Sequence, residues 1–285
     1  MKILFSLGWM LLVSICLSLL LLPACVVLAL LQPDSVLTGI GLALLIPPAL
    51  LAGFFLLLGL TWIYCRALPP TPQGKFNMFE DQGAVLWALN NALPTLLLKL
   101  FQSTLFLNEH LRFCLLRACN ADVRFSSWIP SNVSVADLRN LHLGENVVIG
   151  EHCTLGPAFQ PRPHRLVVSD IHIGDNSLVG AHSLLAAGVQ IGANGLIQAQ
   201  VMIASGSRLG DNVKIGVGTR IDTYCNIGNG AVVGKWVTLL SRAQIPAGAQ
   251  VPDGMTVRGK WTDQNKEDDR KNEGDTNKRI DTDNG

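Results

Sequence analysis

A six-residue period governs the aliphatic positions in the C-terminal half of this chain. Counting in sixes from Leu143 to Val251, eighteen of nineteen positions hold Leu, Ile or Val, and the exception is Pro161. Four residues after most of these positions stands a second, mostly small residue, such as Ser177 or Gly195. A fixed short period of this kind is typical of a solenoid. One large and one small inward position per hexapeptide predict a narrow parallel β-helix filled by stacked aliphatic side chains.

The residues between the inward positions predict the corners of this β-helix. They are Gly, Asn and Asp, as in segments 173–177 and 209–213. These residue types tolerate the positive φ angles that a sharp corner requires.

The pattern resembles the hexapeptide-repeat family, over about residues 129–258. Members of that family fold as left-handed parallel β-helices of triangular section and are most often acyltransferases. The resemblance implies three hexapeptides per coil, hence a register of eighteen residues and a little over six coils counted from Leu143. It also implies acyl-CoA, with acetyl-CoA as the leading choice, as co-substrate, and a homotrimer as the default assembly.

Two long uncharged runs open the chain, over residues 3–33 and 36–64. Each is longer than the ~20 residues needed to cross about 30 Å of hydrocarbon. A polar turn at residues 32–35 separates them. They predict a two-helix transmembrane hairpin over residues 1–66.

The charges beside these runs predict the orientation of the hairpin. Lys2 precedes the first run and Arg66 and Lys75 follow the second, whereas the turn between them carries Asp34. The positive-inside rule then places both ends, and the β-helix, on the cytoplasmic side of a multi-pass inner (cytoplasmic) membrane protein. A competing interpretation takes residues 1–25 as a signal peptide that ends in a lipoprotein-type cleavage box.

Residues 67–128 are expected to join the membrane hairpin to the β-helix domain of residues 129–261. A proline-rich stretch at 68–72 is a stiff linker. Residues 96–107 suggest one or two amphipathic, membrane-proximal helices; a helical cap that only seals the first coil is the alternative. Residues 111–143 resemble the segment that leads into the β-helix of membrane-attached hexapeptide acyltransferases, such as the C-terminal module of polylysine-synthetase-like non-ribosomal peptide synthetases.

Composition supports this division. A mean hydropathy of +0.34 with 15% charged residues is too apolar for an ordinary soluble enzyme of this length. Residues 262–285 alternate acidic and basic side chains with one large aliphatic, so a disordered charged tail is expected. A formal net charge of +1 gives no argument for a nucleic-acid partner. The seven cysteines form no metal or disulfide pattern, and no metal is expected.

Acyl transfer needs a base that takes the proton of the acceptor, and histidine is the usual one because its ordinary pKa lies near working pH. Five of the six histidines fall between residues 142 and 182. The repeat assigns His152 and His182 to corner positions. It assigns His142 and His172 to outward positions on a flat face.

His164 lies in the one stretch where the repeat fails, residues 157–170. That stretch is either a distorted coil or a loop projecting from a corner. In the family the catalytic histidine commonly lies in or beside such an interruption, so the resemblance implies His164 as the base, although it stands a few residues after the expected position. His182, eighteen residues on, is the rival, and the two are expected to stack at equivalent corners of adjacent coils.

Basic side chains are the candidates for binding the phosphates of CoA. Arg162 and Arg165 flank His164. Arg208, Lys214 and Arg220 recur every six residues at an outward position and are therefore expected on three successive faces. The predicted cofactor-binding residues are Arg162, Arg165, Arg208 and Arg220.

The leading hypothesis is a membrane-anchored acyltransferase that moves an acyl group from CoA to a hydroxyl or amine. The membrane hairpin favours an envelope-associated saccharide or a lipid-linked acceptor. One alternative is a non-catalytic β-helix that scaffolds a membrane complex. Another is a carbonic anhydrase-like metal enzyme, which needs three convergent histidines; only His152, His164 and His182 are candidates, and their spacing does not match that class.

Overall fold

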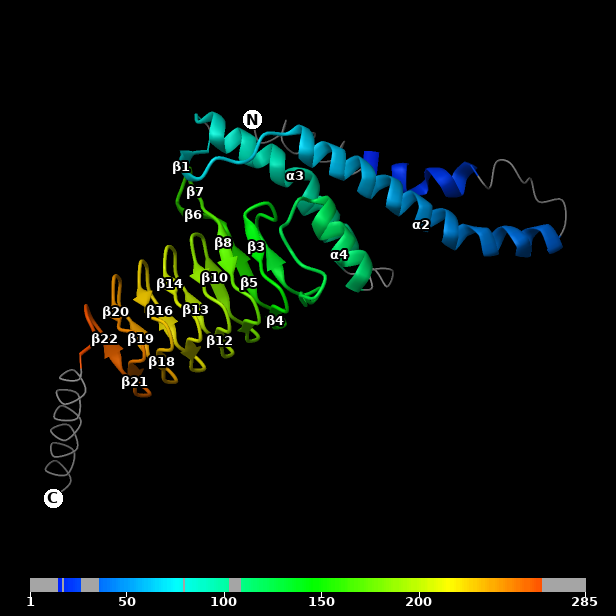
Figure 1. Cartoon of the computed structure of the whole chain (residues 1–285). Coiled ribbons are helices and arrows are strands. Elements are labelled where there is room, and N and C mark those ends of the chain that lie inside the picture. Colours follow the sequence, from blue (N-terminus) through cyan, green and yellow to red (C-terminus); the bar gives the residue numbers. More distant parts are fainter. Residues whose placement is uncertain (1–14, 17, 27–35, 79, 103–108, 263–285) are drawn as a thin grey trace, which may run out of the picture. The chain divides into compact units, whose positions relative to one another are not determined.

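The computed structural model describes residues 15–16, 18–26, 36–78, 80–102 and 109–262. The chain divides into two compact units (Figure 1). A helical unit comprises Met1–Pro72 and Phe79–Ala121, and a solenoid unit comprises Gln73–Met78 and Asp122–Gly285. The predicted charged tail, apart from its first residue, and most of the first predicted span lie outside the described residues.

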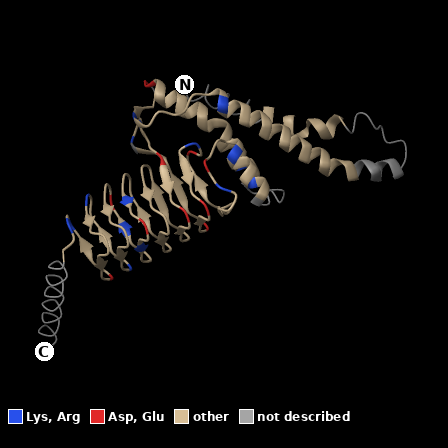
Figure 2. Ribbon diagram, in the orientation of Figure 1, with Lys and Arg blue, Asp and Glu red and all other residues tan. Residues whose placement is uncertain are grey.

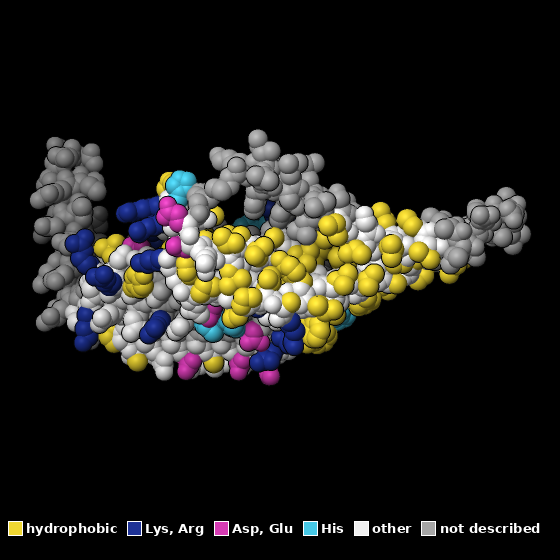
Figure 3. All heavy atoms as spheres, turned by 90° about the horizontal axis from the view of Figure 1, so that it is seen from above, with side chains coloured by type: hydrophobic (Ala, Val, Ile, Leu, Met, Phe, Trp, Pro, Cys, Tyr) yellow, Lys and Arg dark blue, Asp and Glu magenta, His cyan; other side chains and the backbone are white. Residues whose placement is uncertain are grey.

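The described residues of the helical unit include the helices α2 (Val36–Ala67), α3 (Gln82–Gln102) and α4 (Glu109–Ala118). The described residues between 15 and 26 are also helical. Charged residues are rare along α2 and α3 (Figure 2), and hydrophobic side chains cover much of the described helical surface in Figure 3. Among the described residues, two stretches, Leu44–Ala67 and Gln82–Phe101, are long and apolar enough to cross a bilayer by length and composition alone.

The second of these stretches was not predicted as a span. Helix α3 begins fourteen residues before the predicted amphipathic segment 96–107 and continues through Pro94. Asn90 is a polar residue inside this stretch, but its side-chain amide is buried and hydrogen-bonded. Its Nδ2 donates to the carbonyl oxygen of Pro69 at 3.0 Å and to Oγ1 of Thr71 at 3.1 Å. A buried amide with such partners avoids the cost of an unmade hydrogen bond.

The solenoid unit is a parallel β-solenoid with three flat faces, each named here after one of its strands. The β8 face contains β3 (Leu141–Leu143), β8 (Ile171–Ile173), β11 (Gln190–Ile191), β14 (Arg208–Leu209), β17 (Asn226–Ile227) and β20 (Gln244–Ile245). The β9 face contains β4 (Val148–Ile149), β9 (Leu178–Val179), β12 (Leu196–Ile197), β15 (Lys214–Ile215), β18 (Val232–Val233) and β21 (Gln250–Val251). The β10 face contains β2 (Ser134–Val135), β5 (Thr154–Gly156), β10 (Leu184–Ala186), β13 (Met202–Ile203), β16 (Arg220–Ile221), β19 (Thr238–Leu239) and β22 (Thr256–Val257).

The predicted inward positions form the core. Ile173 pairs with Ile191 and Ile191 with Leu209, which confirms the register of eighteen residues from β8 onward. Large inward side chains such as Ile197 and Ile203 are fully buried. Seven stacked strands on the β10 face correspond to about seven turns. The left-handed sense of the coil stays an expectation from the family resemblance.

Hydroxyls at the small inward positions are buried but satisfied by neighbouring coils. Ser177 Oγ donates to the carbonyl oxygen of Gly192 and accepts from the N–H of Gly195, both at 2.9 Å. Thr219 Oγ1 donates to the carbonyl oxygen of Gly234 at 2.8 Å. These bonds explain why Ser and Thr can replace small apolar residues in the core.

The corners have the predicted positive φ angles. Asn176, Asn194 and Asn212 have φ of 56°, 56° and 57°. His152 and His182, predicted at corners, have φ of 57° and 58°. The corner prediction is confirmed at both histidines.

The interruption of the repeat is a projecting hairpin, which decides between the two predicted alternatives. Strands β6 (Ala158–Arg162) and β7 (Arg165–Val168) pair antiparallel, and β1 (Gly74–Asn77) adds to β7 as a third strand. The hairpin leaves the solenoid at the corner between the β10 face and the β8 face, because β5 precedes it and β8 follows it.

The hairpin overturns the register expected across it. Leu155 pairs with Leu185, thirty residues on, and not with Ile173, eighteen residues on; Ile173 pairs with Leu143, also thirty residues away. The insertion adds two hexapeptides' length to one coil, so counting in sixes continues through it undisturbed. Val167 obeys the count but lies in β7, where it pairs with Lys75 and Phe159 instead of filling the solenoid.

The alternation of inward and outward residues predicts unequal effects on stability within one strand. Ile197 is fully buried, whereas its neighbour Leu196 is 37% exposed. We expect Ile197→Ala to lower the free energy of unfolding by about 2–5 kcal/mol, because it removes buried methyl groups and leaves a cavity. Leu196→Ala, the matched control, should cost less than about 1 kcal/mol. Denaturant unfolding monitored by circular dichroism measures both, and equal losses would contradict the assigned inward face.

Candidate functional site

One face of the solenoid carries an unbroken outward row of polar side chains. Successive strands of the β8 face pair these residues directly, and isolated bridges extend the row at both ends. In order the row is Asp122, His142, His172, Gln190, Arg208, Asn226, Gln244 and Lys260. Because paired residues lie side by side on a sheet, their side chains form one continuous surface.

The β9 face is different. Its outward row contains exposed large hydrophobic side chains: Trp128, Val148, Leu178, Leu196 and Val232. The outward row of the β10 face mixes Ser and Thr with Leu184, Met202 and Arg220. The row on the β9 face also contains Lys214, but the histidines and carboxylates of the three outward rows lie on the β8 face.

Two histidines and two carboxylates meet at the N-terminal end of that row. The rings of His142 and His172 are stacked, with centroids 4.5 Å apart and planes 9° from parallel. Nδ1 of His142 lies 3.4 Å from Oδ2 of Asp122. Oδ2 of Asp170 lies 3.7 Å from Nε2 of His142 and 3.9 Å from Nε2 of His172. Gln73, just before β1, donates a hydrogen bond from its side chain to the same Asp170 oxygen.

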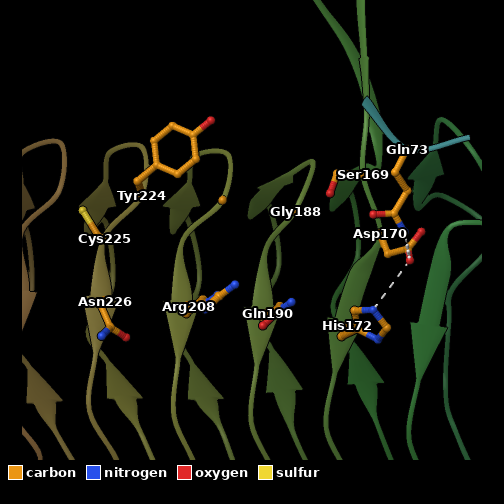
Figure 4. Close-up of a pocket in the computed structure, with 11 residues that line it drawn as sticks. Gln73, Ser169, Asp170, His172, Gly188, Gln190, Arg208, Tyr224, Cys225 and Asn226 are labelled. Carbon is orange, nitrogen blue, oxygen red and sulfur yellow. Dashed lines mark hydrogen bonds and ion pairs between the residues drawn. The ribbon is translucent and has the colours of Figure 1, made fainter. Parts of the chain in front are cut away.

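A pocket of about 670 Å³ opens beside this cluster (Figure 4). In Figure 4, Gln73, Ser169 and Asp170 form the end nearest the hairpin, His172, Gln190, Arg208 and Asn226 follow one another on successive strands, and Tyr224 stands at the far end. Its volume lies within the range typical of small-molecule sites, about 300–1,000 Å³.

The pocket is open at one corner because two residues there are glycines, which have no side chain. Gly188 and Gly206 line the pocket at the corner between the β10 and β8 faces, with φ of 79° and 72°. A methyl group on Gly206 would lie 2.6 Å from Cδ1 of Tyr224, closer than atoms can approach. The ring of Tyr224 thus packs on the glycine backbone and closes one end of the pocket.

His172 is the pocket residue best suited to accept a proton. The pKa of His172 is lowered from its ordinary value, mainly by partial burial and to a smaller extent by the neighbouring His142. The carboxylates of Asp170 and Asp122 act in the opposite direction. A lowered pKa keeps the imidazole neutral at neutral pH, which is the form that acts as a base. His142 does not line the pocket. It lies next to His172 on the neighbouring strand β3 and contacts Asp122 and Asp170.

The structure places the two histidines predicted as catalytic elsewhere. His164 is exposed at the hairpin turn, with φ of 65°, and its carbonyl oxygen accepts a hydrogen bond from Met78 N–H at 2.8 Å. His182 stacks on His152, with centroids 5.1 Å apart, and not on His164 as expected. The physical reason is the insertion, which moves His164 out of the solenoid. Neither His164 nor His182 lines the pocket.

The same placement separates the three histidines considered for a carbonic anhydrase-like site. His152 and His182 lie at the corner between the β9 and β10 faces, whereas the hairpin with His164 leaves from the corner between the β10 and β8 faces. These three residues therefore do not converge.

Of the four predicted CoA-binding arginines, Arg208 lines the pocket. Arg220 lies on the β10 face, and Lys214 on the β9 face, which confirms the expected distribution over three faces. Arg162 and Arg165 pair with each other at the exposed end of the hairpin.

Sequence reasoning missed the part of the site that the insertion creates. His142 and His172 were correctly expected to face outward, but they are adjacent only because the extended coil pairs residues thirty positions apart. Gln73 reaches Asp170 because β1 pairs with β7, and no local sequence pattern predicts this pairing. Asp170, the last residue of the irregular stretch and two residues before His172, was the available signal.

Among the described residues, one group could hold a metal ion: His142, Asp170 and His172, whose ligand atoms all lie within 4.8 Å of one another. Imidazole nitrogens with a carboxylate oxygen are donors typical of transition-metal sites.

No family model matches this chain, and no curated protein matches it. Several solved structures are similar. A variant of AntD, an N-acyltransferase from Bacillus cereus, in complex with dTDP and coenzyme A, is 19% identical, with a TM-score of 0.34, and the match covers 40% of this chain and 70% of that one. The UDP-N-acetylglucosamine acyltransferase from Campylobacter jejuni is 16% identical, with a TM-score of 0.38 and coverage of 48% and 67%.

The acetyltransferase domain of PglB from Neisseria gonorrhoeae is 20% identical, with a TM-score of 0.35 and coverage of 56% and 74%. The β-solenoid of this chain is established by its own strand pairing, independently of these matches.

The neighbours of His172 predict how its pKa responds to substitution. His142→Ala should raise that pKa, because it removes a group that lowers it. Asp170→Asn should lower it further, because it removes a carboxylate that favours the protonated form. NMR titration of the imidazole Hε1 signal in chelator-treated protein measures both shifts. His152→Ala, at the other stacked pair, is the control and should leave His172 unchanged; shifts of the opposite sign would contradict the electrostatic assignment.

Proposed function

We propose that this protein is a CoA-dependent acyltransferase whose reaction takes place in the pocket on the β8 face. The observation that carries the proposal is the alignment of His172, Gln190 and Arg208 on successive strands along that pocket. A base, an amide donor and a fixed cation in one row are the groups that acyl transfer requires. The hexapeptide repeat favours the same activity through its family resemblance.

In the proposed reaction His172 acts as the general base. Its Nε2 takes the proton of the acceptor hydroxyl or amine as the acceptor's lone pair attacks the thioester carbonyl carbon. The Gln190 amide stabilises the oxyanion of the tetrahedral intermediate. The carbon–sulfur bond then breaks, and the CoA thiolate leaves with the proton returned by His172.

The remaining pocket residues supply binding. Arg208 offers a planar cation for a phosphate or carboxylate of the bound molecules. Tyr224 offers the face of an aromatic ring at the end opposite the hairpin, against which a sugar ring can stack. These groups suit the saccharide or lipid-linked acceptor expected from the membrane hairpin. Acetyl-CoA is the proposed donor, and a homotrimer the proposed assembly.

The helices of the N-terminal unit support membrane anchoring. Leu44–Ala67 and Gln82–Phe101 have the length and apolar composition of membrane spans. We keep the first predicted span, residues 3–33, and α2 as the transmembrane pair, with α3 at the membrane surface. This arrangement has an even number of crossings and places the solenoid in the cytoplasm, where CoA is present.

Substitution of the histidines tests the assignment of the base. We expect His172→Ala to lower kcat/KM for transfer of radiolabelled acetyl groups from acetyl-CoA into an envelope fraction by about 10²–10⁴-fold, the usual contribution of a general base. Binding of acetyl-CoA, measured by isothermal titration calorimetry, should persist in this variant, because the side chain is removed from an exposed position.

His182→Ala is the matched control, since His182 also belongs to a stacked pair but does not line the pocket. It should keep full transfer activity, as should His164→Ala. Loss of activity in either of these variants, with activity kept in His172→Ala, would restore the base predicted from the sequence. Absence of saturable acetyl-CoA binding in the unaltered protein would favour the non-catalytic scaffold.

The number of membrane crossings decides the compartment of the solenoid. With two crossings, a fluorescent protein fused to the C-terminus should fluoresce, and an alkaline phosphatase fused there should stay inactive. Helix α3 as a third span would reverse both results. Fusions at residue 72, before α3, are the control, because they report the crossings that precede it.

A further inference from the structure

We infer that His142, Asp170 and His172 form a binding site for a divalent transition-metal ion such as Zn²⁺. The three ligand atoms are Nε2 of each histidine and Oδ2 of Asp170, and they come from three positions that the hairpin brings together. The inference concerns ion binding alone and does not depend on acyl transfer. It departs from the expectation, based on the sequence, that the protein binds no metal.

The polar groups around the three ligands are arranged as in metal sites. Asp122 lies against Nδ1 of His142, the ring nitrogen that does not face Asp170. A carboxylate in that position holds the proton on Nδ1 and leaves the Nε2 lone pair available for an ion. Gln73 donates a hydrogen bond to Asp170 and so orients its carboxylate. Both metal-facing and supporting groups are therefore present.

The separations are close to those of a coordinated ion. Ligands about 2.0–2.1 Å from a tetrahedral ion lie roughly 3.3 Å from one another. Asp170 Oδ2 lies 3.7 Å from Nε2 of His142 and 3.9 Å from Nε2 of His172, so each of these two pairs must close by about half an ångström. All the ligand atoms lie within 4.8 Å of one another, so the histidine pair must close by up to about 1.5 Å. The stacked rings hold their lone pairs side by side, and one ring must turn about its Cβ–Cγ bond to make them converge.

His172 is the ring that can turn. Its side chain is 48% exposed, against 31% for His142, and within the described part of the chain its ring is held by stacking and by the long contact with Asp170. His142 is restrained from the other side by Asp122. Turning an exposed ring leaves the buried solenoid core unchanged.

The donor set selects the class of ion. Two imidazoles and one carboxylate suit Zn²⁺, Co²⁺ or Ni²⁺, whereas Mg²⁺ and Ca²⁺ prefer sites built of oxygen alone. Three protein ligands leave a fourth position for water. A bound ion occupies the lone pair of His172, so metal binding and the proposed base role of that residue exclude each other.

Cobalt titration of the full-length, chelator-treated protein in detergent tests the inference. We expect Co²⁺ to produce the visible d–d absorption of a tetrahedral site at one ion per chain, and Zn²⁺ to displace it. Asp170→Asn, a substitution of nearly the same shape, should abolish the band. Asp122→Asn should weaken Zn²⁺ binding by about 10–100-fold, the usual effect of losing a partner behind a metal-bound histidine.

The second stacked pair provides the matched control. His152 and His182 are stacked in the same way, at a corner of the solenoid. The double variant His152→Ala/His182→Ala should keep both the cobalt band and the Zn²⁺ affinity. Absence of the band, or its loss in this control with retention in Asp170→Asn, would overturn the proposed site. Because the readout is absorption, a protein without transferase activity still tests it.

Discussion

The whole solenoid depends on one constraint, the filling of a narrow core by one aliphatic side chain per hexapeptide. From β8 to β22, three hexapeptides complete a coil, and strand pairing then stacks each residue on the one eighteen positions away. Outward side chains are thereby aligned in rows about 4.7–4.9 Å apart, the spacing of neighbouring strands. A functional surface on such a fold is a row, and its chemistry is decided by which residues share one outward position.

The hairpin of β6 and β7 modifies this constraint at one corner without disturbing the core. Its backbone groups pair within the hairpin and with β1, so the insertion satisfies its own hydrogen bonds. Its base supplies Ser169 and Asp170 to the pocket, and β1 follows Gln73, which holds Asp170. In the next two coils toward the C-terminus, the same corner, between the β10 and β8 faces, carries Gly188 and Gly206. Glycine has no side chain there, so the space beside the hairpin stays open. The pocket therefore results from the inserted hairpin on one side and from the two glycines on the other.

Periodicity predicted the regular part of the fold and failed at the hairpin for an identifiable reason. It located the inward core, the corner histidines and the distribution of Arg208, Lys214 and Arg220 over three faces. A count in sixes cannot distinguish a full coil from an insertion twelve residues long, and Val167 shows this by obeying the count while lying outside the solenoid.

The candidate site was less predictable because its contacts are tertiary. The outward direction of His142 and His172 followed from the repeat, but their stacking required the thirty-residue pairing across the insertion. The position of Gln73 required the pairing of β1 with β7. Family resemblance directed attention into the interruption, to His164, whereas the structure collects titratable groups at the strand that follows it.

The stacked arrangement of His142 and His172 links the two roles proposed for the cluster. While the rings are parallel, their lone pairs do not converge, and the neighbour lowers the pKa of His172 as a base would require. When the His172 ring turns toward Asp170, the same atoms can share an ion, and the His172 lone pair is then not available to accept a proton. One torsion therefore separates a proton-transfer site from a metal site. Asp122 and Gln73, which hold His142 and Asp170 in place, support either state. Occupancy is therefore decided by the His172 ring, whose restraints among the described residues are the stacking on His142 and a long contact with Asp170.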